Sequence, residues 1–234
     1  MNIYKKILIL PVLAAVIPLN IYAKDSSHTT HGEVPDKVVE QQRSSLAKNT
    51  NNMGFGPQSP RDIDMKGGQN SRAFGNAPAY QEMNLCNIHF HKNAEHKGGE
   101  FTLYAGNGDG KGYQSGYKFS GRLSKAEATL SQEVCPSKHG GLNAGDTIEV
   151  HYVHSSAQVK PGPTLGSCLS EAIKNPQLRV ETQVYVLVND EDALNFNEVT
   201  QHSIQNGFYQ ATNIPTNTGK SIEYTGSTTG PGYN

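Results

Sequence analysis

The chain carries almost no net charge and lacks long basic runs. Its 20 lysine and arginine residues nearly balance 21 aspartate and glutamate residues, which leaves a formal net charge of -1 at pH 7. No basic run longer than a pair occurs beyond the first residues. Proteins that bind nucleic acids or anionic membrane surfaces concentrate lysine and arginine on one surface. The sequence therefore predicts neither kind of partner.

Long amphipathic stretches are also scarce. Short apolar runs instead alternate with glycine, proline and asparagine, and the chain contains 24 glycines and 12 prolines. Residues 147–153 and 178–188 are rich in β-branched and aromatic side chains, which favour strands. This pattern predicts a mostly β, β-rich α+β protein. Short helical turns are expected at residues 124–132 and 169–174.

Cysteine is rare, and its number is odd. Cys86, Cys135 and Cys168 cannot all pair within one chain. In an oxidising compartment one of them is free, or its partner is missing. In a regular strand Cys86 points away from His89, three residues on, so we expect Cys86 in a disulfide or in the core. Cys135 and Cys168 flank residues 149–154 and are also placed to form a disulfide, so the pairing stays open.

The first residues have the pattern of an export signal. Lys5 and Lys6 precede an apolar run over residues 7–17, and Ala23 precedes a polar segment. The run is short for a membrane span and is flanked and interrupted by proline. We expect a signal peptide over residues 1–23, cleaved from an exported, periplasmic or secreted protein. An uncleaved anchor is the alternative; after cleavage no stable membrane insertion is expected.

A polar leader is expected to follow the signal. Residues 24–55 are rich in serine, threonine, asparagine, glutamine and lysine and contain few large apolar side chains. Such a segment cannot bury enough surface to offset its ordering entropy. We expect a mobile leader over residues 24–55 and a single domain over residues 56–234.

Histidines recur at alternate positions of two expected strands. His89 and His91 lie two residues apart, roughly 6.6 Å along a strand, and so share one face. His151 lies in the second segment and supplies a third imidazole. Three neutral imidazoles leave one tetrahedral position of zinc open, which is typical of catalytic zinc sites. The sequence therefore predicts a Zn2+ site with these three ligands, and His96 and His154 compete with His151 for the third position.

Two polar side chains are placed to hold these rings. Asn87 and Glu149 precede His89 and His151 by two residues and share their faces. The second nitrogen of a metal-bound imidazole usually donates to a carboxylate, an amide or a carbonyl. We expect Asn87 and Glu149 to accept these hydrogen bonds, with an exposed position at a strand edge as the alternative. Glu95 is expected to orient a hydroxyl group near the metal.

Five segments resemble motifs of α-class carbonic anhydrases and occur in the same order. The motifs are Gln-Ser-Pro-x-x-Ile, His-Phe-His, Glu-His, a strand with Glu-x-His-x-x-His, and a tyrosine-to-threonine loop. The matching segments are residues 56–63, 89–91, 95–96, 149–154 and 224–231. Residues 83–101 look more specifically like the δ-class carbonic anhydrases, and this class is the family that the chain resembles.

The resemblance implies a fold and a reaction. The fold would be a central, largely antiparallel sheet with few short helices, as in the α-carbonic anhydrases. The reaction would be reversible hydration of CO2 to bicarbonate and a proton, by attack of hydroxide bound to zinc at His89, His91 and His151. Zinc in such sites lowers the pKa of its water from roughly 15.7 to about 7, a value taken from carbonic anhydrase itself. The expected partners are therefore CO2 and bicarbonate.

The resemblance also implies roles for residues outside the ligand set. Thr228 or Thr229 would accept the proton of the zinc-bound hydroxide and pass its own hydroxyl hydrogen to Glu95. A buried network behind the third ligand would consist of Tyr224, His96 and Glu149. A fast enzyme also needs a histidine that carries protons to solvent, for which the candidates are His139 and His202.

Two other functions are compatible with the sequence. One is an exported protein that binds or buffers zinc without turnover. The other is a Cu/Zn superoxide dismutase, which is also exported and β-rich but needs further histidine ligands and a bridging aspartate. The chain stops soon after the threonine loop, whereas α-class relatives continue, so we expect a longer natural chain with a partner cysteine after Asn234. The oligomeric state does not follow from the sequence.

Overall fold

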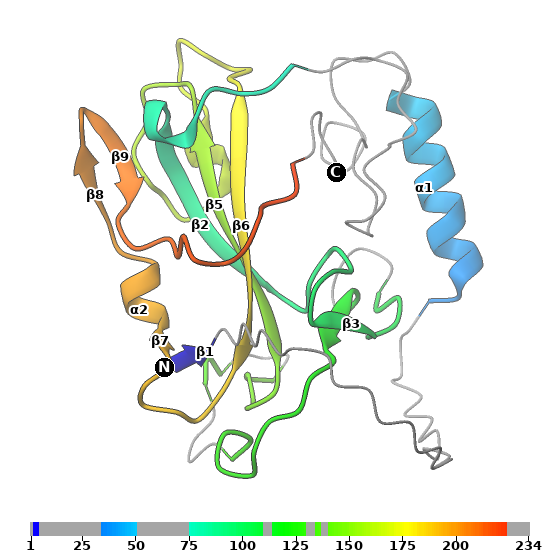
Figure 1. The fold of residues 1–234 in the computed structure, drawn as a ribbon. Coiled ribbons are helices and arrows are strands. Elements are labelled where there is room, and N and C mark those ends of the chain that lie inside the picture. The colour runs from blue at the N-terminus through cyan, green and yellow to red at the C-terminus, as the bar shows by residue number, and fades with distance from the viewer. Residues whose placement is uncertain are drawn as a thin grey trace.

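The computed structural model describes residues 2–4, 34–50, 75–109, 114–129, 134–136 and 140–223 (Figure 1). In chain order, with η for a 3-10 helix, the elements are β1 (Asn2–Tyr4), α1 (Asp36–Thr50), η1 (Tyr80–Glu82), β2 (Asn84–Lys92), β3 (Phe101–Tyr104), β4 (Tyr117–Phe119), β5 (Thr147–Ser155), η2 (Leu165–Cys168), β6 (Leu178–Leu187), β7 (Leu194–Asn195), α2 (Phe196–Val199), β8 (His202–Gln205) and β9 (Phe208–Ala211). Strands dominate, so the expected mostly β fold is confirmed.

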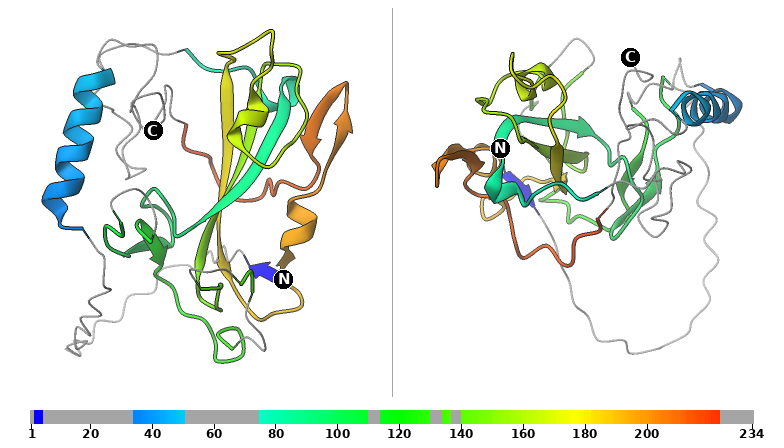
Figure 2. Two further views of the ribbon diagram at one scale, coloured as in Figure 1. Left: turned by 180° about the vertical axis from the view of Figure 1, so that it is seen from behind. Right: turned by 90° about the horizontal axis from the view of Figure 1, so that it is seen from above.

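A five-stranded sheet forms the centre of the fold. Its strand order is β2-β5-β6-β1-β7, and every pairing is antiparallel. The long strands β2, β5 and β6 run side by side in each view (Figures 1 and 2). β3 with β4 and β8 with β9 form separate two-stranded sheets. The expected central, largely antiparallel sheet is therefore confirmed.

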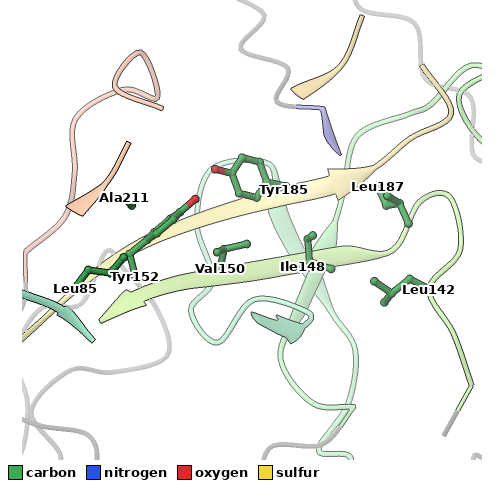
Figure 3. Packing of buried hydrophobic residues seen from close by; sticks show 8 residues of the cluster. All are labelled: Leu85, Leu142, Ile148, Val150, Tyr152, Tyr185, Leu187 and Ala211. Carbon is green, nitrogen blue, oxygen red and sulfur yellow. The ribbon is translucent and has the colours of Figure 1, made fainter. Parts of the chain in front are cut away.

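One face of the central sheet packs the main hydrophobic core (Figure 3). Ile148, Val150 and Tyr152 alternate along β5 and belong to the same cluster as Tyr185 and Leu187 of β6. All five are at most 1% exposed. Burial of a large apolar side chain stabilises a fold by roughly 1.5–3 kcal/mol. This core therefore fixes the phase of β5 and turns its intervening polar residues to the opposite face.

A β-bulge at Cys86 sets the phase of β2. The pairing with β5 steps from Leu85 opposite His154 directly to Asn87 opposite Val153, so Cys86 is an extra residue. Two residues of the bulged strand then oppose one residue of its partner. As a result Leu85 faces the core, whereas Asn87 faces the other side. The regular strand assumed in the sequence analysis would have placed both on one face.

Cys86 and Cys168 form a disulfide. Both are buried, in a small cluster with Val153 and the partly buried Val159. Cys135 is exposed and free. The expectation for Cys86 is confirmed, and the alternative pair of Cys135 with Cys168 is not formed.

The helical turn expected over residues 169–174 is wrong. The 3-10 helix η2 ends at Cys168, and Leu169 is already extended. Ser170 Oγ accepts a hydrogen bond from the backbone N–H of Ile173 at 3.0 Å. The backbone N–H of Ser170 donates to the Ile173 carbonyl at 3.1 Å, opposite to the direction of helical hydrogen bonds, so the segment closes as a loop. In the segment 124–132, the described residues 124–129 form turns without a regular helix.

The long helix α1 lies in the predicted leader. Its start is held by Asn107, whose Nδ2 donates to the Val34 carbonyl at 3.1 Å and to the Asp36 carboxylate at 2.6 Å. Glutamine, lysine, alanine and leucine favour a helix even where little surface is buried. Figure 2 shows α1 standing apart from the central sheet. The leader, expected to be mobile, thus contains a helix, and the boundaries at residues 24–55 and 56–234 stay predictions.

The N-terminal strand β1 pairs with β6 and β7. It belongs to the predicted signal peptide, whose other residues lie outside the described part of the chain. Cleavage of residues 1–23 therefore stays a prediction. Among the described residues, no helix is both long enough and apolar enough to cross a membrane.

Candidate metal centre

Three histidine side chains meet on the sheet face opposite the core. His89 lies directly opposite His151 in the β2–β5 pairing, and His91 lies opposite Glu149. The ring centroids are 5.1 Å apart for His89 and His91, 5.1 Å for His89 and His151, and 5.0 Å for His91 and His151. One ring nitrogen of each lies within 4.8 Å of the others. The structure therefore brings together the three ligands predicted from the sequence.

Asn87 determines which nitrogen of His89 is available. Asn87 Nδ2 donates to the Gly162 carbonyl at 2.9 Å, which turns Asn87 Oδ1 toward His89 Nδ1, 2.6 Å away. An amide oxygen only accepts, so Nδ1 carries the hydrogen and the lone pair lies on Nε2. Burial, together with the neighbouring His151 and His91, lowers the pKa of His89 to about 4. The ring is therefore neutral at neutral pH, as a metal ligand must be.

Glu149 holds His151 by the opposite nitrogen. Its Oε1 lies 2.6 Å from His151 Nε2, which leaves Nδ1 free, and its Oε2 accepts the backbone N–H of Glu95 at 2.7 Å. Burial raises the pKa of Glu149, but the hydrogen bond and charge of His151 outweigh burial, and the pKa lies below its ordinary value. Burial lowers the pKa of His151, but Glu149 outweighs it and raises this pKa. A buried, charged carboxylate thus fixes the third ring.

A protein-family model matches most of the domain that contains this cluster. The model describes the delta carbonic anhydrases, and it matches residues 80–234. The chain belongs to the delta carbonic anhydrase family. No curated protein and no solved structure matches the chain. Membership confirms the resemblance stated above and indicates carbonic anhydrase activity, with CO2 and bicarbonate as the small-molecule substrates.

Glu95 and His96 lie beside the histidine cluster. Glu95 Oε1 is 3.9 Å from His91 Nε2. Glu95, Glu149 and His151 form a second group whose ligand atoms lie within 4.8 Å of one another. His96 is close enough for its charge to contribute to the lowered pKa of Glu149. The roles of both residues stay predictions, because the threonines and the tyrosine that the resemblance places beside them lie outside the described residues.

The structure places one of the two proton-transfer candidates. His202 is exposed at the start of β8 and lines a pocket that also includes His89. The other residues around this pocket are Ile88, Phe90, Pro161, Gly162, Phe196 and Thr200. Four further predicted residues lie outside the described residues: Tyr224, Thr228, Thr229 and His139.

Two neighbours of the cluster were missed in the sequence analysis. Gly162 holds Asn87 through its carbonyl oxygen, although 75 positions separate them in the sequence. Phe196 lines the same pocket as His89 and packs edge to face against Phe90 on the core side of β2, with ring centroids 5.5 Å apart. No local sequence pattern marks either residue. The link between Cys86 and Cys168 would have been the only signal that the Gly162 loop lies beside β2.

His154 lies on the opposite face of β5 from the ligands. It is fully buried, its Nδ1 lies 3.0 Å from the Tyr152 carbonyl, and its ring packs against Tyr80. Its Nε2 has no hydrogen-bond partner in the described part of the chain. This placement takes His154 away from the face of the ligands, so His154 does not compete with His151 for the third position.

We expect His154 to make the fold sensitive to acid. Burial, together with the charge of Arg179 and against the hydrogen bond to Tyr152, lowers its pKa from 6.5 to about 4. The unfolded chain therefore takes up a proton near pH 6.5 that the folded protein accepts only near pH 4. Stability that is present above pH 6.5 is lost as the pH falls, by about 2 kcal/mol between pH 7 and pH 5.

Denaturant unfolding of the metal-free protein at pH 7 and pH 5 measures this loss. His154→Phe keeps a ring beside Tyr80 and removes the titrating group. The free energy of unfolding that this variant loses between pH 7 and pH 5 should therefore be about 2 kcal/mol smaller than the loss in the parent protein. An equal loss in both proteins would assign the acid sensitivity to other groups.

Proposed function

We propose that this chain catalyses the zinc-dependent, reversible hydration of CO2 to bicarbonate and a proton. The convergence of His89, His91 and His151 in a member of the delta carbonic anhydrase family carries the proposal. The donor set fits zinc, because three imidazole nitrogens suit this metal and leave one tetrahedral position open.

The hydrogen bonds around the cluster support specific ligand atoms. His89 would bind through Nε2 and His151 through Nδ1, because Asn87 and Glu149 engage the other nitrogens. When bound, zinc lowers the pKa of a coordinated water to about 7, the value known from carbonic anhydrase itself, so that hydroxide is available near neutral pH. His91 is exposed, which gives small molecules access to this position from solvent.

Glu95 would orient the attacking group through a loop threonine. In this proposal Glu95 accepts the hydroxyl hydrogen of Thr228 or Thr229, and the hydroxyl oxygen accepts the proton of the hydroxide. The placement of Glu95 beside His91, with its backbone N–H held by Glu149, supports this role. The arrangement would aim a lone pair of the hydroxide at the carbon of CO2.

Stopped-flow CO2 hydration by the zinc-loaded full chain tests the proposed reaction. We expect hydration above the buffer rate, inhibition by a sulfonamide, and loss of activity in His91→Ala. Replacement of both Thr228 and Thr229 by valine should lower the rate by about a hundredfold while zinc binding is retained. Tight zinc binding without hydration would contradict the proposal and identify a metal-binding or metal-buffering protein.

The described residues give a superoxide dismutase no support. Two groups among these residues could hold a metal ion. Both groups include His151, and neither contains an aspartate. A bridged two-metal site needs more histidines and an aspartate. Loss of CO2 hydration in the His91→Ala variant, without any superoxide-dependent reaction in the parent protein, would separate the two functions.

We expect His202 to carry protons between the site and solvent. It is exposed and lines the same pocket as His89. Histidine is the side chain that exchanges protons near neutral pH. His202→Ala should lower kcat about tenfold in dilute buffer, leave kcat/KM within about twofold, and recover with added imidazole. An unchanged kcat in dilute buffer would exclude His202 and favour His139.

We also propose that the protein is exported and cleaved after Ala23. A buried disulfide is compatible with an oxidising compartment. Mass spectrometry of the protein isolated from its native compartment should find Lys24 at the N-terminus. An intact Met1 would support the uncleaved anchor.

A further inference from the structure

A continuous chain of contacts leads from the disulfide to the first histidine of the cluster. Cys86 is the bulged residue of β2, and Asn87, which holds His89, follows it directly. Cys168 lies at the end of η2, in the loop that also contains Gly162. The disulfide therefore ties this loop to the strand that carries the site.

Two hydrogen bonds fasten the loop to β2 next to the disulfide. The backbone N–H of Gly162 donates to the Cys86 carbonyl at 3.0 Å, and Asn87 Nδ2 donates to the Gly162 carbonyl at 2.9 Å. The far end of the loop is held by Ser155, whose hydroxyl donates to the Cys168 carbonyl at 2.7 Å. Cys86, Asn87 and Cys168 are each at most 2% exposed. The Gly162 carbonyl is thus held as an acceptor against the buried amide of Asn87.

This acceptor decides how the Asn87 amide is oriented. An amide group can present either its oxygen or its NH2 group to His89. The bond from Nδ2 to Gly162 leaves Oδ1 for His89 Nδ1 and so leaves His89 Nε2 free. If Gly162 moved away, the amide could turn, and its NH2 group would then favour the tautomer with the lone pair on Nδ1.

We propose that the Cys86–Cys168 disulfide sets the metal affinity of the histidine cluster by holding the Gly162 carbonyl against Asn87. Asn87 and Gly162 are positioning residues in this scheme, since they act through His89. The proposal rests on the metal site of the proposed function but not on CO2 hydration. Partners of this kind typically change metal affinity 10–100-fold.

The proposal makes metal affinity depend on the redox state of the chain. Reduction by a dithiol breaks the S–S bond: the dithiol supplies two electrons and two protons, the chain gains two thiols, and the reductant becomes a disulfide. The reverse exchange with an oxidised dithiol forms the bond again. A chain that has not yet formed this disulfide would therefore hold zinc weakly.

Zinc titration against a chromophoric chelator tests the proposal on purified, folded proteins. The zinc Kd should rise 10–100-fold in the double variant Cys86→Ala with Cys168→Ala, and by a similar factor in Asn87→Ala. When Asn87→Ala is added to the double variant, the zinc Kd should rise by less than a further factor of about two. The reason is that loss of the disulfide and loss of the Asn87 amide break the same chain of contacts. Cys135→Ser, which removes the exposed free thiol, should leave Kd unchanged.

Two glycines of the same loop provide a matched pair that keeps the disulfide. A Cβ on Gly162 would overlap Ser167 Oγ and lie 2.9 Å from Ser167 Cβ, so Gly162→Ala must shift the loop. A Cβ on Gly166 would lie 3.4 Å from Thr164 Oγ1, which is tolerable. The zinc Kd should rise in Gly162→Ala and stay within about twofold of the parent value in Gly166→Ala.

Asn87→Asp provides the rescue. A carboxylate offers an oxygen to His89 Nδ1 in either orientation and needs no partner at Gly162 to be turned correctly. The zinc affinity of Asn87→Asp should therefore respond less than twofold to loss of the disulfide. The 15N shifts of the His89 ring should report hydrogen on Nδ1 in the parent protein and a mixture of tautomers in the disulfide-free variant.

Three results would overturn the proposal. One is parental zinc affinity in a folded disulfide-free variant, which would leave the disulfide a purely stabilising role. Another is a parental zinc affinity in both Gly162→Ala and Asn87→Ala. This result would be decisive even if the disulfide-free variant did not fold. Absence of zinc binding in the parent protein would remove the metal site itself. Zinc binding with the expected pattern but without CO2 hydration would overturn only the proposed function.

Discussion

Replacement of His151 by alanine is expected to abolish tight zinc binding and to reduce CO2 hydration to the buffer rate. His151 is the one predicted ligand on β5, and it faces His89 across the strand pair. Its loss leaves two imidazoles, which no longer define a tetrahedral site with a single open position. The fall in zinc affinity should exceed the roughly 10–100-fold that loss of an outer partner produces.

The same substitution should weaken the metal-free fold. Glu149 is 2% exposed, and its pKa is kept low chiefly by the hydrogen bond and charge of His151. Removal of one partner from a buried ion pair leaves an uncompensated charge, at a cost of about 3 kcal/mol. Denaturant unfolding measures this loss, and chelator competition and stopped-flow hydration measure the other two effects.

His154→Phe is the matched control for His151→Ala. His154 lies three residues beyond His151 on β5 and faces the core. The His154→Phe variant should retain zinc affinity and CO2 hydration even though its stability changes. Zinc affinity that survived His151→Ala, or fell equally in the control, would contradict the assignment of the third ligand.

Replacement of Glu149 by alanine is the second large expected effect. The carboxylate holds His151 Nε2 at 2.6 Å and the Glu95 backbone N–H at 2.7 Å, so it fixes both the third ring and the residue proposed to orient the hydroxide. Zinc affinity should fall about 10–100-fold. Hydration at saturating zinc should also fall, because Glu95 loses the acceptor that positions its backbone.

Glu149→Gln separates orientation from charge. The glutamine oxygen can still accept from His151, so a small loss of zinc affinity would mean that orientation dominates. Glu181→Gln is the control, since this partly exposed carboxylate on β6 pairs with Arg179 instead. A Kd that is unchanged in Glu149→Ala, or equally changed in Glu181→Gln, would show that the buried carboxylate does not support the metal site.

The positions of the side chains around the histidine cluster were partly predictable because strands alternate. His89 and His91 share a face through a two-residue period, and the same period predicted that Asn87 and Glu149 share the faces of His89 and His151. The placement of His151 opposite His89 depends on the pairing of β2 with β5. Asn87 and Glu149 contact the expected rings in the structure. These are short-range relations along a strand, so a single sequence contains them.

The remaining features depend on contacts between distant segments. The bulge at Cys86 arises from the pairing of β2 with β5, and the regular strand assumed from the sequence could not show it. Gly162 reaches Asn87 from a loop 75 positions further along the chain, and no local pattern of the sequence contains this contact. Local propensity was therefore insufficient wherever tertiary contacts decided the conformation.

The position of the disulfide also has a topological consequence. Cys86 and Cys168 are separated by 82 positions, and they close a covalent ring that contains every proposed zinc ligand together with Glu95 and Glu149. A single peptide-bond cleavage anywhere inside this ring opens it without separating the ligands into two molecules. The nicked halves would part only after reduction, so one covalent closure keeps the three proposed zinc ligands, Glu95 and Glu149 within a single molecule.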